Sequence, residues 1–299
     1  MAHVNQAKRL KKLLAKNKRN KVKNPVKKKD KKKKIINAPR TFYLPPYSGE
    51  PKYSFIAAAI RDYHYEDLYN SINDNNPVPF ELILVGDKPP QKPMPSNFRY
   101  IETSVKPAQC LEIAAREATG EYLITTGDDL RYPEDYLKLV EYYVMKLDMG
   151  KVFITFRYSF HFKVNDEQLI FDANPNSPVI GFSGVYRRDL WNSLGGIDNR
   201  FVSAMTETDM VMRFFEYGLN IFIPPDTYPN EIHQKKGELT SFAKSGFSGL
   251  ETLYSLWRHP DGSISKTRLS PVQSFVDEDI LVKNQGVSSS TGKKGTFTW

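Results

Sequence analysis

The sequence predicts an α/β fold with a Rossmann-like mixed sheet that carries helices on both faces. From Tyr53 onward, short apolar runs alternate with segments of helical period. This alternation is typical of a parallel sheet whose two faces are covered. The 299 residues are 40% hydrophobic, which is enough for the core of one large domain.

The first 34 residues differ sharply in charge from the rest of the chain. They contain 16 of the 43 Lys and Arg residues and one of the 34 acidic residues, so they carry +15 while the remainder carries −6. Such a segment cannot bury enough apolar surface to offset the entropy of ordering. We expect a disordered basic tail over residues 1–36, a globular domain over 37–232 and a further region over 233–299.

Cysteine content and apolar patterning bear on the compartment. The single cysteine, Cys110, excludes an internal disulfide and a thiolate zinc cluster, which suits a reducing environment. No stretch reaches the roughly 18 apolar residues of a membrane span, and the lysine-rich N-terminus lacks the apolar part of a secretory signal. We expect a cytoplasmic protein without a transmembrane segment, either free or peripheral at a membrane or on nucleic acid.

The individual elements follow from local pattern. Apolar runs predict strands at residues 53–60, 80–85, 121–126 and 220–225, and a hairpin formed by 151–160 and 167–173. Helical period predicts helices at residues 65–73, 109–119, 208–217 and 250–257, the third of which Gly218 ends. A further helix is expected from Pro133 to residue 147, because proline suits a first helical turn.

Acidic residues follow two of the predicted strands. Asp87 comes after the second strand, and Asp128 and Asp129 come after the third. Ligands of open α/β sheets bind at the carboxyl ends of the strands. Adjacent carboxylates are hard oxygen ligands for Mg²⁺ or Mn²⁺. Acid pairs in loops are commonly solvated or cap a helix, so this pair alone does not identify a metal site.

Four segments in order resemble glycosyltransferase family 2. They are YSFIAAAIRDYHYEDLYNSI, FELILVGD, TGEYLITTGDDLRYPEDYL and LGGIDNRFVSAMTETDMVMRFFEYG. The resemblance covers residues 53–233. The last is the most specific, because it matches the family's Gly-Gly-aromatic-Asp, Glu-Asp-x-Asp, Arg and Gly pattern without a gap. The resemblance implies a GT-A fold and an inverting nucleotide-sugar transferase, with viral or phage enzymes among the relatives to expect.

The resemblance also implies roles for individual residues. Glu207 takes the position of the general base, with Asp209 and Arg213 supporting it. The metal ligands, for Mn²⁺ or Mg²⁺, are Asp129 and His233. The nucleotide-sugar site comprises Ala58, Ile60, Arg61, Asp87, Asp128 and Gly184, with Asp87 contacting the base. An alternative role for Asp209 and Arg213, one helical turn apart, is an ion pair that orients the segment.

The chain departs from the family pattern at three places. Gly127 stands where the first acid of Asp-x-Asp is usual, which predicts a weaker metal site. Glu207 replaces the commoner Asp, so the base is longer by one methylene. Ala58, Ala59 and Ile60 stand where the family often has Pro or Thr followed by an aromatic residue. Nucleotide selectivity therefore stays open, with a UDP-sugar favoured.

These residues predict a metal-dependent hexosyl- or pentosyltransferase that acts on an acceptor hydroxyl. The domain over 37–232 would be catalytic, and the region over 233–299 would serve as acceptor site or lid, where Trp257 could stack on a sugar or base. The basic tail favours a polyanionic acceptor, either DNA with modified bases or an anionic glycan or lipid. One alternative is a non-catalytic nucleic-acid-binding protein with a degenerate transferase domain. Another is a nucleotidyltransferase, but such enzymes carry a glycine-rich loop after the first strand, and the segment AAAIRDYHY at this place contains no glycine.

Overall fold

The computed structural model describes residues 50–74, 76–103, 105–162, 168–171, 184–225, 230–234 and 249–275. The predicted basic tail over residues 1–36 lies outside the described residues. None of the described helices combines the length and the apolar character that crossing a membrane requires.

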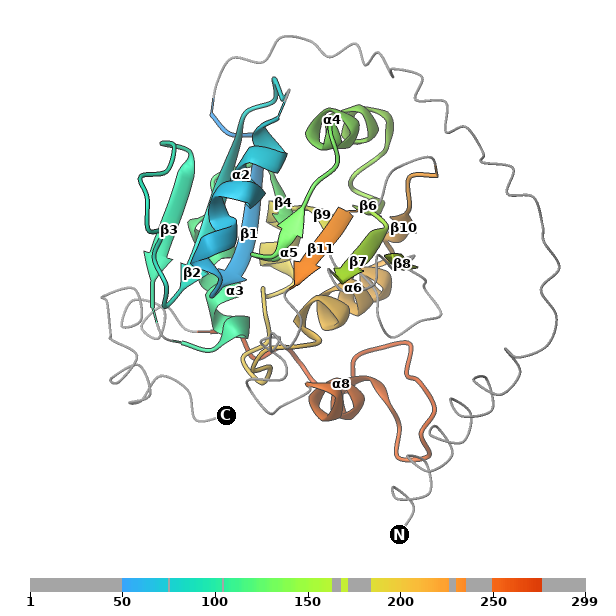
Figure 1. Ribbon diagram of the computed structural model, residues 1–299. Coiled ribbons are helices and arrows are strands. Elements are labelled where there is room, and N and C mark those ends of the chain that lie inside the picture. Colours follow the sequence, from blue (N-terminus) through green and yellow to red (C-terminus); the bar gives the residue numbers. More distant parts are fainter. Residues whose placement is uncertain are drawn as a thin grey trace, which may run out of the picture. The chain divides into compact units, whose positions relative to one another are not determined.

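A mixed sheet of seven strands lies at the centre of the described fold (Figure 1), in the order β10-β6-β9-β4-β1-β2-β3. Its strands are β1 (Tyr53–Ala59), β2 (Phe80–Gly86), β3 (Phe98–Glu102), β4 (Tyr122–Thr125), β6 (Val152–Thr155), β9 (Gly184–Arg187) and β10 (Asn220–Phe222). Strands β3, β2, β1 and β4 run parallel, and β9 runs antiparallel to both β4 and β6. The carboxyl ends of β1, β2 and β4 therefore meet at one edge of the sheet.

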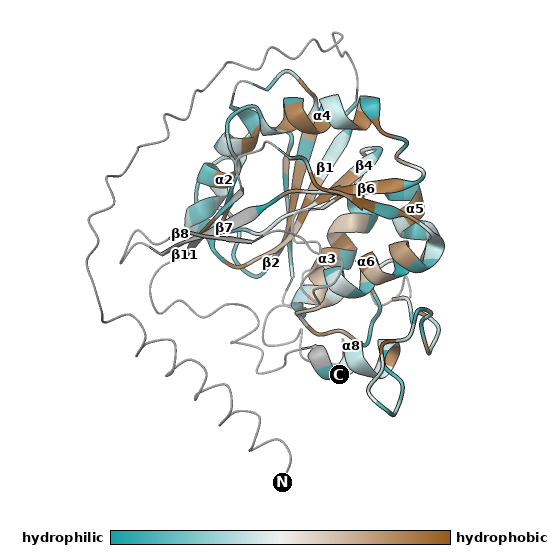
Figure 2. Cartoon of the chain, turned by 90° about the vertical axis from the view of Figure 1, so that its right-hand side faces the viewer, coloured by the Kyte–Doolittle hydropathy of each residue, from teal (hydrophilic) through white to brown (hydrophobic). Residues whose placement is uncertain are grey.

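Helices cover both faces of this sheet (Figure 2). One face carries α2 (Tyr65–Asn73) and α4 (Tyr136–Lys146), and the other carries α3 (Pro107–Glu117) and α6 (Thr206–Tyr217). Two shorter helices, α5 (Arg188–Ser193) and α8 (Leu250–Trp257), complete the described set, with a 3₁₀ turn at Asp62–His64. Each face has its own core, because alternate side chains of a strand point to opposite sides.

A second sheet lies beside the acidic residues that follow β4. Its strands are β5 (Leu130–Arg131), β11 (Asn230–Gln234), β7 (Tyr158–Phe162) and β8 (Gln168–Phe171), in that order. Strand β5 begins directly after Asp129, and β11 pairs antiparallel with it. This small sheet therefore brings residues 230–234 next to the segment that follows β4.

Most predicted elements are confirmed, and two are corrected. The run at 151–160 is not a single hairpin strand, because β6 joins the central sheet while β7 pairs with β8 in the small one. The helix expected from Pro133 begins instead at Tyr136, since Asp135 adopts a left-handed backbone with φ 61°. Pro133 lies in the preceding turn, where its carbonyl accepts a hydrogen bond from the Tyr136 amide at 3.1 Å.

Gly86 lets the ends of β1 and β2 pack closely. A methyl group on this residue would overlap the backbone carbonyl of Ala59, its partner in the parallel register. The obstructing Ala59 carbonyl belongs to strand backbone, so it cannot rotate away. The close approach fixes the spacing of the two strand ends from which Asp87 and the loop after β1 emerge.

We predict that Gly86→Ala destabilises the fold by about 1–3 kcal/mol, the usual cost of overpacking a core. The change is measured as the free energy of unfolding in urea. Gly150→Ala is the control, because its methyl would meet the end of a flexible side chain, Asp148 Oδ1, at 3.2 Å. An equal loss in both variants would contradict this account of Gly86.

Candidate functional site

Asp128 ties the ends of β1 and β4 together. Its Oδ2 accepts hydrogen bonds from the backbone amides of Ile60 at 2.6 Å and Arg61 at 2.8 Å. The Arg61 guanidinium donates to the other oxygen, Oδ1, and Asp128 is only 2% exposed. Three predicted site residues, Ile60, Arg61 and Asp128, are thus held in one buried cluster.

The same arginine also faces the second acid. Arg61 Nη1 lies 3.4 Å from Asp129 Oδ2, and the arginine side chain is 7% exposed. Burial raises the pKa of the Asp128 carboxyl, while the Arg61 charge opposes that rise. The guanidinium therefore supplies the positive charge that permits two adjacent carboxylates in a buried position.

Asp87 follows β2 at the same edge and is exposed. The loop that carries it is fastened on both sides of Lys88. The Tyr65 hydroxyl donates to the Lys88 carbonyl at 3.0 Å, and the Lys88 amide donates to the Tyr100 hydroxyl at 2.8 Å. Ala58, near the end of the neighbouring β1, is half-buried. A flat ligand placed against this edge could meet an ordered loop and an accessible carboxylate.

Gly184 begins β9 beside the end of β4, where its amide donates to Thr125 Oγ1 at 3.1 Å. A methyl group on Gly184 would overlap the Tyr186 hydroxyl, so the glycine leaves room for this phenol. Tyr186 is 1% exposed, and burial raises its pKa, with the Glu207 carboxylate adding to the effect. Sequence reasoning missed Tyr186, whose side chain hydrogen-bonds to Thr125 at the end of β4.

Glu207 lies in the first turn of α6. The preceding Met205 has a left-handed backbone with φ 69°, which is uncommon for a residue with a side chain. The Thr206 hydroxyl donates to Glu207 Oε2 at 2.7 Å. Burial raises the pKa of the Glu207 carboxyl. A raised pKa brings a carboxylate closer to the range that suits a general base.

Asp209 and Arg213 form the ion pair that their spacing allows. Arg213 Nε lies 3.0 Å from Asp209 Oδ2, and the two residues are 3% and 0% exposed, respectively. Asp209 Oδ1 also accepts from the Trp257 indole at 2.8 Å and from Arg268 Nε at 3.1 Å. Trp257 is 2% exposed, so the expectation that it stacks on a ligand is wrong.

The predicted metal ligands Asp129 and His233 lie in or next to paired strands of the small sheet. Within the described ranges, no group of three or more His, Cys, Asp or Glu side chains is arranged to hold a metal. In the antiparallel register of β5 and β11, Leu130 lies opposite Ile232. Extending that register by one residue places His233 across from Asp129. Because Mg²⁺ is commonly held by one or two carboxylates plus substrate phosphates, the residues present fit such an ion.

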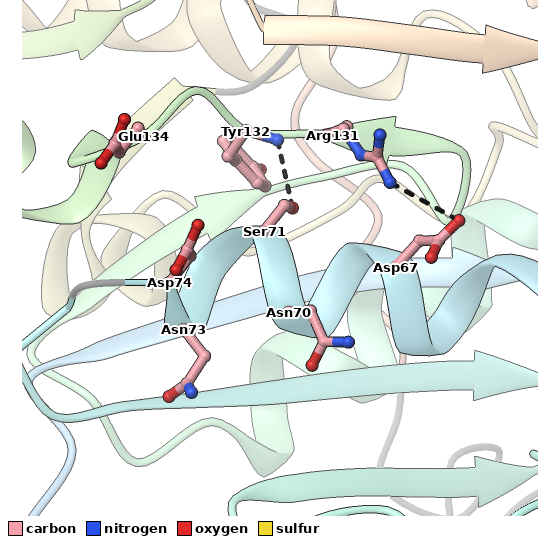
Figure 3. Close-up of a pocket in the computed structure, with 8 residues that line it drawn as sticks. All are labelled: Asp67, Asn70, Ser71, Asn73, Asp74, Arg131, Tyr132 and Glu134. Atoms are coloured by element: carbon pink, nitrogen blue, oxygen red, sulfur yellow. Dashed lines mark hydrogen bonds and ion pairs between the residues drawn. The ribbon is translucent and has the colours of Figure 1, made fainter.

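A polar cavity of 680 Å³ lies between α2 and the segment after β5 (Figure 3). Carboxylates, amides and hydroxyls line it: Asp67, Asn70, Ser71, Asn73, Asp74, Arg131, Tyr132 and Glu134. Arg131 Nη2 lies 3.7 Å from Asp67 Oδ2, and the Tyr132 amide donates to Ser71 Oγ at 3.2 Å. The cavity contains none of the predicted site residues.

We predict that Arg61→Met destabilises the protein by about 3–5 kcal/mol, because it leaves the buried Asp128 charge without its partner. The measurement is urea unfolding at neutral pH. Arg187→Met removes an arginine from an exposed pair with Asp189 and should cost about 1 kcal/mol or less. Equal losses in the two variants would show that the Arg61 contact is no stronger than a surface pair.

No protein-family model matches the sequence, and no curated protein matches it. Among solved structures, a fragment of S. aureus TarS in complex with UDP-GlcNAc superposes with a TM-score of 0.52 at 16% identity, covering 68% of this chain and 63% of that chain. The same fragment without that ligand gives 0.49 at 15% identity, covering 60% of each chain. The mannosyltransferase PcManGT from Pyrobaculum calidifontis, in complex with GDP-Man and Mn²⁺, gives 0.45 at 16% identity, covering 64% of this chain and 60% of that chain. This chain thus spans about three fifths of the TarS fragments in these two matches. It has the GT-A-like fold that the sequence predicts, as the superposition on the UDP-GlcNAc complex shows.

Proposed function

We propose that this protein is a glycosyltransferase that moves a sugar from a nucleoside-diphosphate sugar to an acceptor hydroxyl, with Glu207 as the general base. The observation that carries the proposal is the place of Glu207 in the first turn of α6, where the Thr206 hydroxyl donates to its Oε2 at 2.7 Å and burial raises its pKa, in a fold whose ligands bind at the carboxyl edge of the sheet. The strand ends at that edge carry Asp87, Asp128 and Asp129, in a fold used by nucleotide-sugar transferases.

In this proposal the donor lies across the ends of β1, β2 and β4. Asp87 accepts a hydrogen bond from the base, and the half-buried residues Ala58 and Ile60 of β1 and its loop contact the nucleoside. Arg61 and Asp128 keep that loop in place through their buried contacts. The overlap with the TarS complex makes UDP-GlcNAc the first donor to test.

A divalent cation, Mn²⁺ or Mg²⁺, would bind to Asp129 and His233 together with the oxygens of the diphosphate. The register of β5 and β11 supports this pair of ligands. A bound cation of this kind offsets the negative charge that develops on a departing nucleoside diphosphate. Arg61 Nη1, 3.4 Å from Asp129, is a second positive charge at the same edge.

The reaction would be a single displacement with inversion. Glu207 takes the proton from the acceptor hydroxyl while that oxygen forms a bond to the anomeric carbon. The bond between the anomeric carbon and the phosphate oxygen breaks at the same time, and its electron pair leaves with the nucleoside diphosphate. No covalent sugar–enzyme intermediate is needed, so one carboxylate base is sufficient.

The acceptor would be a hydroxyl on a polyanion, either DNA or an anionic glycan or lipid. The charge of +15 on residues 1–34 supports this choice, because lysine-rich segments bind phosphate-rich surfaces. A cytoplasmic location is consistent with such acceptors. Binding of DNA with no sugar transfer would instead favour a nucleic-acid-binding protein that keeps the transferase fold.

We predict that Glu207→Gln lowers the rate of UDP release by about 10²–10⁴-fold, the usual contribution of a general base. Its affinity for UDP-GlcNAc, measured by calorimetry with Mn²⁺, should stay close to wild type. Glu251→Gln, an exposed change on α8, is the control. A normal rate in Glu207→Gln would remove Glu207 from the mechanism.

The wild-type rate should also fall with acidification. Because the base acts deprotonated and burial raises the pKa of Glu207, activity is lost as the pH falls through this raised pKa. The midpoint should lie above the ordinary glutamate value of about 4.3. The measurement is kcat from pH 4 to pH 8, and a flat profile down to pH 4 would contradict the assignment.

For the metal, we predict that Asp129→Ala weakens donor binding by about tenfold or more, since a carboxylate ligand is lost. The binding of Mn²⁺ alone, followed by its electron paramagnetic resonance signal, should weaken in parallel. Asp148→Ala, a change in an exposed turn, should alter neither. Unchanged Mn²⁺ affinity in Asp129→Ala would exclude this residue as a ligand.

A further inference from the structure

Residues 249–275, here called the C-terminal segment, pack directly against the start of α6. Gly249, in a left-handed conformation with φ 67°, lies so close to Ala204 that a methyl group would overlap its carbonyl. Leu253, Leu256 and Trp257 are buried in the same core as Phe201, Met210 and Phe214. The turn that carries Glu207 is therefore covered by a segment more than 40 residues further along the chain.

A buried charge cluster joins this segment to the turn. Arg268 Nη2 donates to Asp198 Oδ2 at 2.7 Å, and Arg268 Nε donates to Asp209 Oδ1 at 3.1 Å. The Arg268 side chain is 5% exposed, and the two aspartates are 0% exposed. Burial alone would raise the pKa of Asp198, but hydrogen bonds from Arg200 and Arg268 hold it at about 2. Asp198 is therefore charged where it meets Arg268.

Asp198 and Asp209, which lie before and after Glu207 in the sequence, thus share the guanidinium of Arg268. Asp198 precedes the turn, and Asp209 lies two residues after Glu207. The backbone reinforces this closure, because the Asn199 amide donates to the Gln273 carbonyl at 2.8 Å. A planar guanidinium with fixed donor directions sets the separation of two carboxylates more strictly than a flexible ammonium group can.

The first turn of α6, which carries Glu207, needs these contacts because the backbone just before it is strained. Met205 holds a left-handed backbone just before Thr206 and Glu207, a conformation that costs about 1–3 kcal/mol and persists only where surrounding structure imposes it. Gly249 packs against Ala204 and Met205 on one side, while Trp257 and Arg268 hold Asp209 on the other. Buried ion pairs add little net stability compared with apolar packing, but they fix geometry.

We propose that Arg268 is a positioning residue that sets the location of the Glu207 carboxylate by holding Asp198 and Asp209 across the turn. The proposal rests on the proposed function for its consequence in catalysis. Its structural part, the fixed turn, stands independently. Within the described residues, the side-chain hydrogen bonds of Arg268 go to Asp198, Asp209 and the Ser270 carbonyl, none of which is a predicted donor-binding group.

The test compares Arg268→Met, Arg268→Lys and Trp257→Phe with the control Lys266→Met, which removes an exposed positive charge two residues away. Each full-length variant is measured for UDP release from UDP-GlcNAc, for UDP-GlcNAc affinity with Mn²⁺, and for amide hydrogen exchange. The exchange measurement compares residues 201–209 with the distant strand β2. Trp257→Phe keeps the ring packing while removing the indole donor to Asp209, so it also tests the cluster if Arg268→Met fails to fold.

We expect Arg268→Met to lower kcat by about a hundredfold, because a displacement of the general base by about 1 Å costs roughly that much. The affinity for UDP-GlcNAc should stay unchanged. Arg268→Lys should recover part of the loss. Exchange should rise in residues 201–209 and stay constant in β2, while Lys266→Met matches wild type throughout. Loss of kcat together with donor affinity, or unchanged exchange in the turn, would overturn the proposal.

The outcome for the wild type separates this proposal from the proposed function. If wild-type protein neither binds nor cleaves UDP-GlcNAc or other sugar nucleotides, the proposed function fails. The exchange measurement then still decides whether Arg268 fixes the turn. Normal exchange in residues 201–209 of the Arg268 and Trp257 variants would reject the positioning role regardless of activity.

Discussion

The carboxylate of Asp128 accepts two backbone amides from the loop after β1 and the guanidinium of Arg61, although it belongs to the segment after β4. The parallel neighbours β1 and β4 are thereby joined beyond the last residues of their paired register. The groups that follow Asp128 in sequence depend on that junction for their location. Asp129 follows in sequence, β5 begins one residue later, and the small sheet then carries residues 230–234 back to the same place.

The acids around α6 divide their roles according to their surroundings. The Thr206 hydroxyl donates to Glu207, which lowers the pKa of this carboxyl, but burial is the larger effect and raises that pKa. Asp209, two residues on, is enclosed by Arg213, Arg268 and the Trp257 indole. A carboxylate so completely surrounded is a fixed counterion. Under the proposed function, one short sequence thus supplies both the general base and the anchor of its own helix.

Local patterns in the sequence were sufficient to predict β1, β2, β4, α2 and α8, because each is a contiguous apolar or amphipathic run. Strand β3 was missed because only Phe98 of its five residues is buried, and the short β9 because its four residues run directly into α5. The acids at strand ends were predicted from topology alone. The partners of Asp209 were not predicted. Trp257 and Arg268 are 48 and 59 residues away from it, and no local sequence pattern encodes such a pairing.

That sequence separation also affects how the protein is made. During synthesis, α6 leaves the ribosome well before Trp257 and Arg268, so its buried aspartate must wait for partners that do not yet exist. Domains acquire long-range contacts late, because the entropy of closing the loop has to be overcome first. The central strands and α2 can pair early through contacts that are near in sequence. The proposed catalytic turn would therefore be among the last parts of the domain to become ordered on a nascent chain.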